Sequence, residues 1–330
     1  MNECFEINNN IRNKSINRDP KISIIIPVFN CENSINFSIN SIRNQKFEDI
    51  EILLVNDFSK DNSKYIIENL QKKDPRIKII NNNKNMGTLY SRNIGVIHSK
   101  GKYIFALDND DLYLNRNIFS KMYKTAEKYN YDIIGFNSIY SYNYNSKINN
   151  MFIDPFITDK TDKIIYQPNL KFLSITNNDV HIWGKCIKTE IYKKAISLLG
   201  PKRGKTYLCN AEDDVMIYML FGLAKNFRYI PVFGIFHLIS SITASKTLPK
   251  DHLIFSKIFF LDLIFDFTND SIFEKAYVVT VAKIIKEYSI INNLPLNEKN
   301  EKYLNSVLKK IFDCPYITKK DKELLKKIYY

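Results

Sequence analysis

The chain has 330 residues, of which 45% are hydrophobic and 25% are charged, and its formal net charge at pH 7 is +13. These proportions fit a globular protein of one large domain or two ordinary ones, and the charge suits a polyanionic partner or an anionic membrane face. The five cysteines are scattered and include no C-x-x-C pair, which argues against a disulfide framework or a zinc site and favours a reducing compartment.

The N-terminal segment, residues 1–20, is polar and rich in Asn, so it is expected to form a flexible arm and not a signal peptide. No apolar run reaches the ~18 residues that a membrane span needs. The run that comes closest, 253–267, is interrupted by Lys257, Asp262 and Asp266. We therefore expect a cytoplasmic protein, with peripheral attachment to the cytoplasmic membrane face left open.

A regular alternation of apolar strands and amphipathic helices begins at residue 21. Strands are predicted at 22–28, 50–55, 77–80, 103–107 and 132–136, and helices at 34–44, 63–73, 89–99 and 117–129. Such an alternation predicts an α/β fold, with a mostly parallel sheet that is flanked by helices on both faces.

The second half of the chain is less regular. Residues 138–170 are polar and are expected to form a loop, and 200–210 a mobile basic loop. Further strands are predicted at 183–187 and 228–236, and helices at 189–199 and 211–225, the last with Asn210 as its N-cap. From about residue 251 onward the pattern is helical only, with a Lys-rich end.

The apolar strand at 103–107 leads directly into three acids, Asp108, Asp110 and Asp111. Burying carboxylates is costly unless they are paired, and a hard cation such as Mg²⁺ or Mn²⁺ takes oxygen ligands and commonly binds substrate phosphates. The segment therefore indicates a metal site. Taken alone, it fits equally well a solvated acidic turn in which Asp111 opens the next helix.

Two further polar residues follow strands that would end at the same edge of the sheet, where open parallel sheets bind ligands. Asp57 could accept a hydrogen bond from a nucleobase or a ribose hydroxyl, and the alternative is an Asx turn before the next helix. Arg92, in the first turns of the helix at 89–99, would reach the same crevice unless it is an ordinary surface arginine.

Four segments follow one another in the first half of the chain: IIIPVFN at 24–30, VNDFSKD at 55–61, NMG at 85–87 with SRNIG at 91–95, and LDNDD at 107–111. Together they resemble the family 2 glycosyltransferases of the GT-A fold, and the resemblance covers about residues 20–240. Their order and spacing match the family. Asn56 stands where an Asp is common and Phe58 where the family usually has Gly, which puts the shape of that turn in doubt.

The resemblance implies a role for each matching residue. Binding of the donor nucleotide falls to Pro27, Phe29, Asn30, Asp57, Arg92, Asp108 and Asn109. Asp110 would hold a Mn²⁺ or Mg²⁺ ion on the donor diphosphate together with His237, whose alternative is a structural role after an apolar strand. UDP is the expected donor nucleotide, with GDP and dTDP left open.

In the second half, the pair Glu212-Asp213 at a helix start resembles the family's acidic pair, whose aspartate is the general base. Inverting transfer needs a carboxylate that takes the proton of the acceptor hydroxyl. We assign this role to Asp213, with Glu212 and Asp214 as alternatives. The structural explanation is that acids in the first turn of a helix complement its dipole.

Four residues are assigned to the acceptor or to phosphate. Trp183 and Lys185 resemble the W-x-K segment that precedes the acceptor helix, and Trp183 either stacks on a sugar or belongs to the core. Lys202 and Arg203 either close over the diphosphate or lie in a solvated loop.

The sequence thus predicts an inverting, metal-dependent glycosyltransferase that acts on a hydroxyl of a glycan or lipid-linked acceptor. We expect it to add one sugar and not to polymerise, because the Q-x-x-R-W motif and membrane spans of the polymerising synthases are absent. Its expected parts are an arm (1–20), a nucleotide-sugar half (21–137), an acceptor half of the same domain (138–245) and a helical extension (246–330).

The main alternative function is a non-catalytic protein that binds a sugar-nucleotide or glycan on the same fold. Two other functions have less support. A nucleotidyltransferase would need a Gly-rich basic loop after the first strand, which is absent, and a nucleic-acid-binding protein would need a recognised binding motif, so no nucleic-acid partner is expected. The apolar faces of the C-terminal helices either pack on the catalytic domain or contact a membrane surface.

Overall fold

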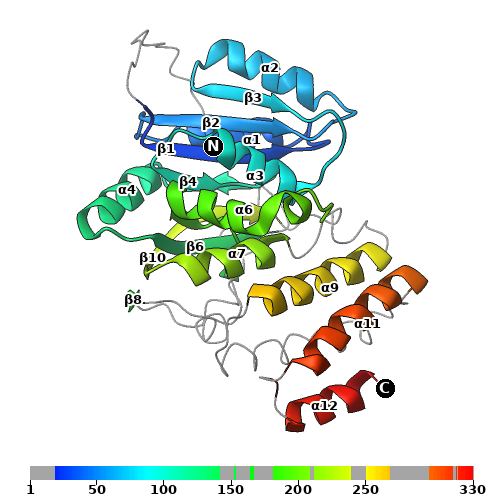
Figure 1. The fold of residues 1–330 in the computed structure, drawn as a ribbon. Helices are drawn as coiled ribbons and strands as arrows, with labels where there is room; N and C mark the ends of the chain where they lie inside the picture. The colour runs from blue at the N-terminus through cyan, green and yellow to red at the C-terminus, as the bar shows by residue number, and fades with distance from the viewer. Residues whose placement is uncertain are drawn as a thin grey trace.

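In its described part, the chain folds around a ten-stranded mixed sheet with helices on both faces, as the computed structural model shows (Figure 1). The structure describes residues 19–141, 152–153, 164–166, 181–208, 212–238, 250–267, 297–314, 317 and 319–329. Residues 1–18 of the arm predicted at 1–20, and the predicted N-cap Asn210, lie outside these residues. The α/β class predicted from the sequence is confirmed.

The first half follows the predicted alternation closely. Its four strands are parallel and lie in the order β3-β2-β1-β4: β1 (Ile22–Val28), β2 (Ile50–Asn56), β3 (Ile77–Asn81) and β4 (Tyr103–Ala106). The connecting helices are α1 (Ile35–Arg43), α2 (Ser63–Lys73) and α3 (Thr88–His98).

The second half continues the same sheet with mixed directions. The antiparallel strand β9 (Lys185–Lys188) lies between β4 and β6 (Ile133–Ser141), and β6 pairs in parallel with β10 (Asn226–Leu238). Three short strands pair antiparallel to these: β5 (Leu112–Tyr113), β7 (Phe152–Ile153) and β8 (Ile164–Tyr166). The helices of this half are α4 (Ile118–Tyr129), α6 (Thr189–Gly204) and α7 (Glu212–Leu223).

Alternate side chains of β1 enter two separate hydrophobic cores. Ile25 belongs to the core shared with α3, α6 and α7, whereas Ile24 and Ile26 belong to the core shared with α1, α2 and α4. Because both faces of the sheet are covered, every residue of β1 is buried. Helix α3 approaches β1 closely at Gly95, where an added Cβ would lie 2.6 Å from a methyl carbon of Ile25. This approach fixes the height of α3 above the sheet.

Two predictions for the second half were wrong. The expected basic loop at 200–210 is helical as far as Gly204, because α6 breaks at Gly200 (φ 76°) and restarts at Pro201, a residue tolerated in the first turn of a helix. Within the expected loop at 138–170, residues 138–141 instead extend β6 along β10, and residues 152–153 and 164–166 form β7 and β8. The other residues of this range lie outside the described part of the chain.

The C-terminal extension consists of α9 (Lys250–Phe267), α11 (Glu298–Asp313) and α12 (Lys319–Tyr329), which step away from the α7 side of the sheet (Figure 1). Ile258, Leu261 and Ile264 of α9 are buried in the core shared with α7 and α11. The apolar residues of α9 therefore pack against α7 and the rest of this core, which agrees with packing on the domain, one of the two predicted alternatives. Within the described residues, no helix is long and apolar enough to cross a membrane.

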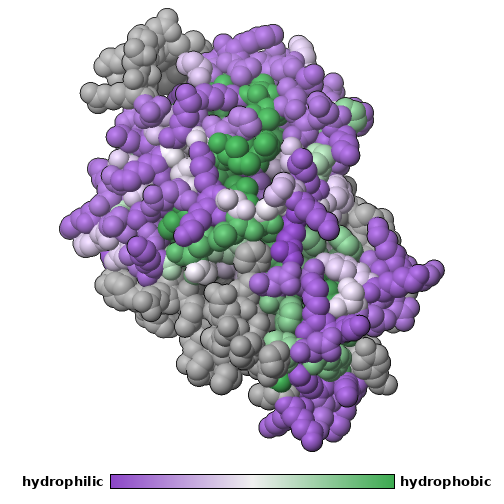
Figure 2. All heavy atoms as spheres, viewed as in Figure 1, coloured by the Kyte–Doolittle hydropathy of each residue, from purple (hydrophilic) through white to green (hydrophobic). Residues whose placement is uncertain are grey.

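The surface of the described part is mostly polar in the view of Figure 2. An apolar strip runs down the middle of this face, and the outward sides of α11 and α12 are polar (Figure 2). Lysines supply much of this polarity, since Lys299, Lys302, Lys309, Lys319 and Lys320 are all exposed. Any contact made by these outer sides would consequently be electrostatic and not apolar.

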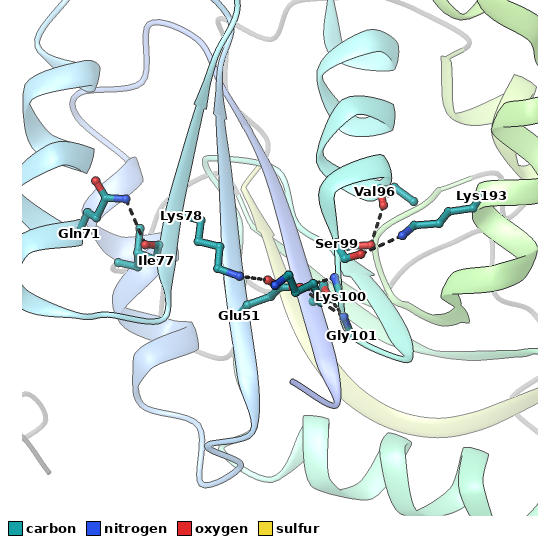
Figure 3. Close-up of polar contacts among 10 residues, drawn as sticks. Glu51, Gln71, Ile77, Lys78, Val96, Ser99, Lys100, Gly101 and Lys193 are labelled. Atoms are coloured by element: carbon teal, nitrogen blue, oxygen red, sulfur yellow. Dashed lines mark hydrogen bonds and ion pairs between the residues drawn. The ribbon is translucent and has the colours of Figure 1, made fainter. Parts of the chain in front are cut away.

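A buried carboxylate fastens the α3–β4 turn to the sheet at the edge opposite the strand ends (Figure 3). Glu51 of β2 accepts hydrogen bonds from Lys78 Nζ and the Lys100 backbone N–H, each at 2.6 Å, and from the Ser23 hydroxyl. Burial opposes the charge of Glu51, but the hydrogen bonds from Lys78, Ser23 and Lys100 outweigh burial and hold its pKa below the ordinary value of 4.5. Glu51 therefore stabilises the fold as an anion.

We expect Glu51→Gln to lower the free energy of unfolding by about 2–4 kcal/mol at pH 7, because the amide NH₂ cannot accept these bonds and buried donors lose their partner. Since the pKa is lower in the folded state, the stabilisation is present above about pH 4.5 and is lost as the pH falls below it. Urea unfolding at several pH values measures both effects. The control is Glu68→Gln, which removes an exposed 3.9 Å ion pair with Lys64 and should change the free energy of unfolding by less than about 1 kcal/mol. Equal losses of unfolding free energy in the two variants would contradict the role of Glu51.

Candidate active site

Three strand ends meet at one edge of the sheet. The neighbouring parallel strands β2, β1 and β4 all run toward this edge, and the segments that follow them are bonded to one another. Asn109 donates to the Pro27 carbonyl (3.0 Å), and the Asp57 N–H donates to the Val28 carbonyl (2.8 Å). The structure thus brings together the residues that the sequence assigned to the donor nucleotide from all three segments.

Asp57 organises the loop ahead of α3. Its buried carboxylate accepts from the side chain of Asn82 and from the backbone N–H groups of Met86 and Gly87, all at 2.8 Å. The turn within its own segment is made instead by Asn56, whose side-chain oxygen accepts from the Ser59 N–H (3.1 Å). The Asx turn considered for Asp57 therefore belongs to Asn56, and Asp57 fixes the loop that leads into α3.

The turns after β1 and β2 are cross-linked. Asn30 accepts from the Lys60 N–H (2.8 Å), and the Asn30 N–H donates to the Ser59 hydroxyl (3.2 Å). Asn30 (φ 45°) and Phe58 (φ 64°) both adopt left-handed backbone conformations. The turn keeps a conformation that suits Gly, although Phe58 occupies it.

Arg92 joins the donor side to the acceptor side. It lies on α3, its side chain is only 2% exposed, and its guanidinium contacts Asp213 (2.6 Å) and Asp108 (3.1 Å). Burial disfavours the charge, but the carboxylates of Asp213 and Asp108 outweigh burial and raise the pKa of Arg92. Arg92 is therefore not a surface arginine, because it holds one acid from each half of the chain.

The three acids after β4 differ in surroundings. Asp111 is fully buried, precedes β5, and accepts from the Leu238 N–H (3.2 Å) and from Nδ1 of His237. The alternative of a solvated turn in which Asp111 opens a helix is therefore wrong. Asp108 and Asp110 are partly exposed, and burial together with the neighbouring Asp111 and Asp108 raises the pKa of Asp110 to about 7. Like charges are thus crowded here.

His237 forms an ion pair with Asp111, 2.9 Å away. Burial disfavours the imidazolium, but the carboxylate of Asp111 outweighs burial and raises the pKa of His237 to about 9. The contact between Nδ1 of His237 and Asp111 agrees with the structural alternative, and the role of His237 as a metal ligand stays a prediction. In the part of the chain that the structure describes, no group of three or more His, Cys, Asp or Glu residues is arranged to hold a metal ion.

Trp183 and Lys185 are buried beside this ion pair. The indole ring is stacked between His181 (4.3 Å between ring centres) and His237 (5.0 Å), and Trp183 is 5% exposed. Lys185 is 1% exposed and donates to the His181 carbonyl at 2.5 Å. Because Trp183 is buried and already stacked on two imidazole rings, stacking on a sugar is not available in this arrangement, and Lys185 does not face solvent.

The three acids that begin α7 have different partners. Asp213 accepts from Arg92 and from the Ile182 N–H (3.2 Å), whereas Asp214 pairs with Lys257 of α9 (3.5 Å). Burial and the neighbouring charge of Asp213 raise the pKa of Glu212 to about 8. Of these three acids, only Asp213 is bonded to the donor-side residue Arg92. This contact favours Asp213 over Asp214 as the candidate for the general base.

The two basic residues at the end of α6 have different surroundings. Arg203 pairs with Asp266 of α9, and Lys202 is exposed. The segment after them returns to the donor side, since the Leu208 carbonyl lies 3.0 Å from the position of a Cβ added at Gly87. Lys202 and Arg203 therefore stand on the end of α6 and not in a loop of their own.

Comparison with known proteins identifies the family of this site. The sequence model described as glycosyl transferase family 2 matches residues 23–184. The chain is also 30% identical over 183 residues to the UDP-Glc:alpha-D-GlcNAc-diphosphoundecaprenol beta-1,3-glucosyltransferase WfgD of Escherichia coli, covering 52% of this chain and 71% of WfgD. The chain belongs to glycosyltransferase family 2.

Other curated glycosyltransferases match shorter stretches of the chain. The GalNAc(5)-diNAcBac-PP-undecaprenol beta-1,3-glucosyltransferase of Campylobacter jejuni is 39% identical over 111 residues, 33% of this chain and 36% of the relative. The chain thus spans about a third of the length of this and similar curated relatives. Among solved structures, S. aureus TarS 1–349 in complex with UDP-GlcNAc has a TM-score of 0.68 at 16% identity, covering 93% of this chain and 87% of TarS 1–349. This likeness confirms the GT-A type of fold.

Several residues that bond to the candidate site residues could not be found from the family motifs. Asn82, which bonds Asp57, follows β3 in an Asn-rich run that gave no signal. The pairs Asp111–His237 and Asp214–Lys257 join residues more than 40 positions apart, so no local pattern could reveal them. Asp111 did carry one usable signal, because it stands next to the D-x-D acids and ahead of an apolar pair.

Proposed function

We propose that the protein is an inverting, metal-dependent glycosyltransferase, which moves one sugar from a UDP-sugar to a hydroxyl of a glycan or lipid-linked acceptor. The observation that carries this proposal is the bridge from Asp108 through Arg92 to Asp213, since it connects the D-x-D acids with the acid expected to act as the base. UDP-GlcNAc in the TarS complex supports the donor class, and the diphosphoundecaprenol acceptors in the names of two relatives support the acceptor class.

The donor nucleotide would occupy the edge formed by the three strand ends. Pro27, Phe29, Asn30 and Asn109 lie on the bonded segments there, and Asp57 fixes the loop beside them. Ligands of open α/β sheets bind beyond the carboxyl ends of the strands, which agrees with this placement.

The acids after β4 have the chemistry of a divalent-cation site. Asp108 and Asp110 offer partly exposed carboxylate oxygens, and the crowding of negative charge that raises the pKa of Asp110 is relieved when a cation binds. We assign Asp110 as the principal ligand for Mn²⁺ or Mg²⁺, with Asp108 beside it. When bound, the cation neutralises charge on the departing diphosphate.

Asp213 acts as the general base in this proposal. Its carboxylate takes the proton of the acceptor hydroxyl while that oxygen forms a bond to the anomeric carbon and the bond from this carbon to the diphosphate breaks. Attack from the face opposite the diphosphate inverts the anomeric configuration. The hydrogen bonds from Arg92 and the Ile182 N–H orient the carboxylate, and Asp214 is engaged with Lys257 instead.

Peripheral attachment to a membrane belongs to the same proposal, because a lipid-linked acceptor lies in a membrane. The exposed lysines of α11 and α12 would supply electrostatic attraction to an anionic surface, on the cytoplasmic side. Lys202, on the exposed end of α6, remains assigned to phosphate.

A thermal-shift panel tests the proposal. UDP, GDP, dTDP and CMP are each added with and without Mn²⁺ to the wild type and to Asp110→Ala. We expect UDP with Mn²⁺ to raise the melting temperature of the wild type by several degrees, and the Mn²⁺-dependent part to vanish in Asp110→Ala, because a ligand stabilises the state it binds. Glu68→Gln, on the exposed side of α2, should behave like the wild type. If no nucleotide changes the melting temperature of the wild type, the proposed donor site is wrong. If Asp110→Ala responds to Mn²⁺ as the wild type does, the proposed role of Asp110 as a metal ligand is wrong.

A further inference from the structure

Phe58 occupies a backbone conformation that its side chain disfavours. Its φ is +64°, in the left-handed region, where residues with a Cβ are strained and bulky ones are outliers. The other non-glycine residues with positive φ in the described part of the chain are Asn30 and Asn130, and Asn tolerates this region because its short polar side chain bonds locally. Phe58 has no such compensation, so its strain needs another reason.

The turn itself does not need an aromatic side chain. Its bonds are made by Asn56 and Ser59, and Gly would adopt the same φ without strain. Packing does not explain the ring either, because Phe58 is 40% exposed. Strain of this kind persists mainly where function requires it, and the exposed ring is the feature that a Gly would lack.

The surroundings of the ring indicate what it would contact. Lys60 Nζ lies 3.5 Å from the centre of the Phe58 ring, and the side chain is 40% exposed, so a ligand can reach the ring from solvent. Phe58 directly follows Asp57, and its turn is bonded to the turn that carries the second exposed ring, Phe29, which is 41% exposed. An exposed aromatic ring with a cation beside it suits a flat heteroaromatic ring attached to an anion.

We propose that Phe58 stacks on the nucleobase of the donor and thereby determines how tightly the nucleoside part is held. This inference rests on the proposed function and adds to it a residue that departs from the family's usual Gly. Lys60 contacts the phenyl ring and holds it in place. The strain at Phe58 is therefore retained because the side chain strengthens donor binding.

The test separates the base from the phosphates. UDP and inorganic pyrophosphate, each with Mn²⁺, are titrated calorimetrically into the wild type, Phe58→Gly and Phe58→Tyr. Because base–aromatic stacking commonly contributes a roughly ten-fold factor in affinity, we expect Phe58→Gly to bind UDP roughly ten-fold more weakly and pyrophosphate as the wild type does. Phe58→Tyr keeps the ring and should bind UDP like the wild type.

The matched control is Tyr129→Leu, since Tyr129 is also an exposed ring with a lysine over it, 48% exposed and 4.9 Å from Lys128 Nζ, at the far end of α4. It should bind UDP normally. Unchanged UDP affinity in Phe58→Gly would overturn the inference, and so would equal losses for UDP and pyrophosphate, which would mean that Phe58 only shapes the turn. A melting temperature near that of the wild type shows that Phe58→Gly is folded. A wild type that binds no nucleotide would overturn the proposed function as well.

Discussion

Asp213→Asn is expected to lower the turnover number for sugar transfer by about 10²–10⁴-fold, the range that general base catalysis contributes, while donor affinity changes by no more than a few-fold. The carboxylate is the only acid of α7 bonded to the donor-side residues, through Arg92 at 2.6 Å. The amide keeps the shape of the side chain but cannot take the proton of the acceptor hydroxyl. Initial rates of nucleotide release at saturating acceptor, with donor affinity from calorimetry, measure the two quantities separately.

Asp214→Asn is the control for this substitution. Asp214 is the next residue on the same helix, but it pairs with Lys257 of α9 and not with Arg92. Its loss should change the turnover number by less than about ten-fold. Comparable losses in the two variants would show that acids in the first turn of α7 serve the helix and not the reaction.

Arg92→Ala is expected to produce the largest loss of stability among the single changes at the site, about 3–5 kcal/mol in the free energy of unfolding. Removing a fully buried cation leaves Asp213 and Asp108 unpaired, with side chains only 17% and 33% exposed. Activity should also be lost, because Asp213 is no longer oriented. Urea unfolding of the purified variant measures the stability change.

Arg43→Ala provides the comparison for Arg92→Ala. Arg43 also pairs with a carboxylate, Asp74, at 3.2 Å, but its side chain is 24% exposed and Asp74 retains Arg76 as a partner. Its loss should cost about 1 kcal/mol or less. The double variant Arg92→Ala/Asp213→Ala should be less destabilised than the sum of the two single changes, because the carboxylate left unpaired by the first is removed by the second. Strict additivity would contradict the bridge.

The first half of the fold could be predicted because its signals are local. Each strand from β1 to β4 is a short apolar run, each helix carries one apolar face, and the polar residues assigned to the donor stand directly after strands. Parallel pairing then places those residues at one edge without further information. The same logic predicted that Asp213 opens a helix.

The rest could not be predicted because it depends on contacts between distant segments. Arg92 was expected near the nucleotide, yet its partners on β4 and α7 follow only from how α3 packs on the sheet. Trp183 was expected either to face a sugar or to belong to the core. It is buried and stacks on His181 and His237, so it belongs to the core. Gly200 and Pro201 indicated a loop, but a positive φ at Gly200 lets the helix restart.

The central claim is that Asp213 activates an acceptor hydroxyl for inverting transfer from a UDP-sugar. The most direct test is proton NMR of the product formed by the wild type from UDP-sugars, Mn²⁺ and a diphospholipid-linked sugar acceptor, with UDP release followed in parallel. The account predicts UDP release that depends on the acceptor and a new anomeric configuration opposite to that of the donor. A retained configuration would contradict the role of Asp213, and a protein that binds UDP-sugars but releases no UDP with any acceptor would be a binding protein and not a transferase.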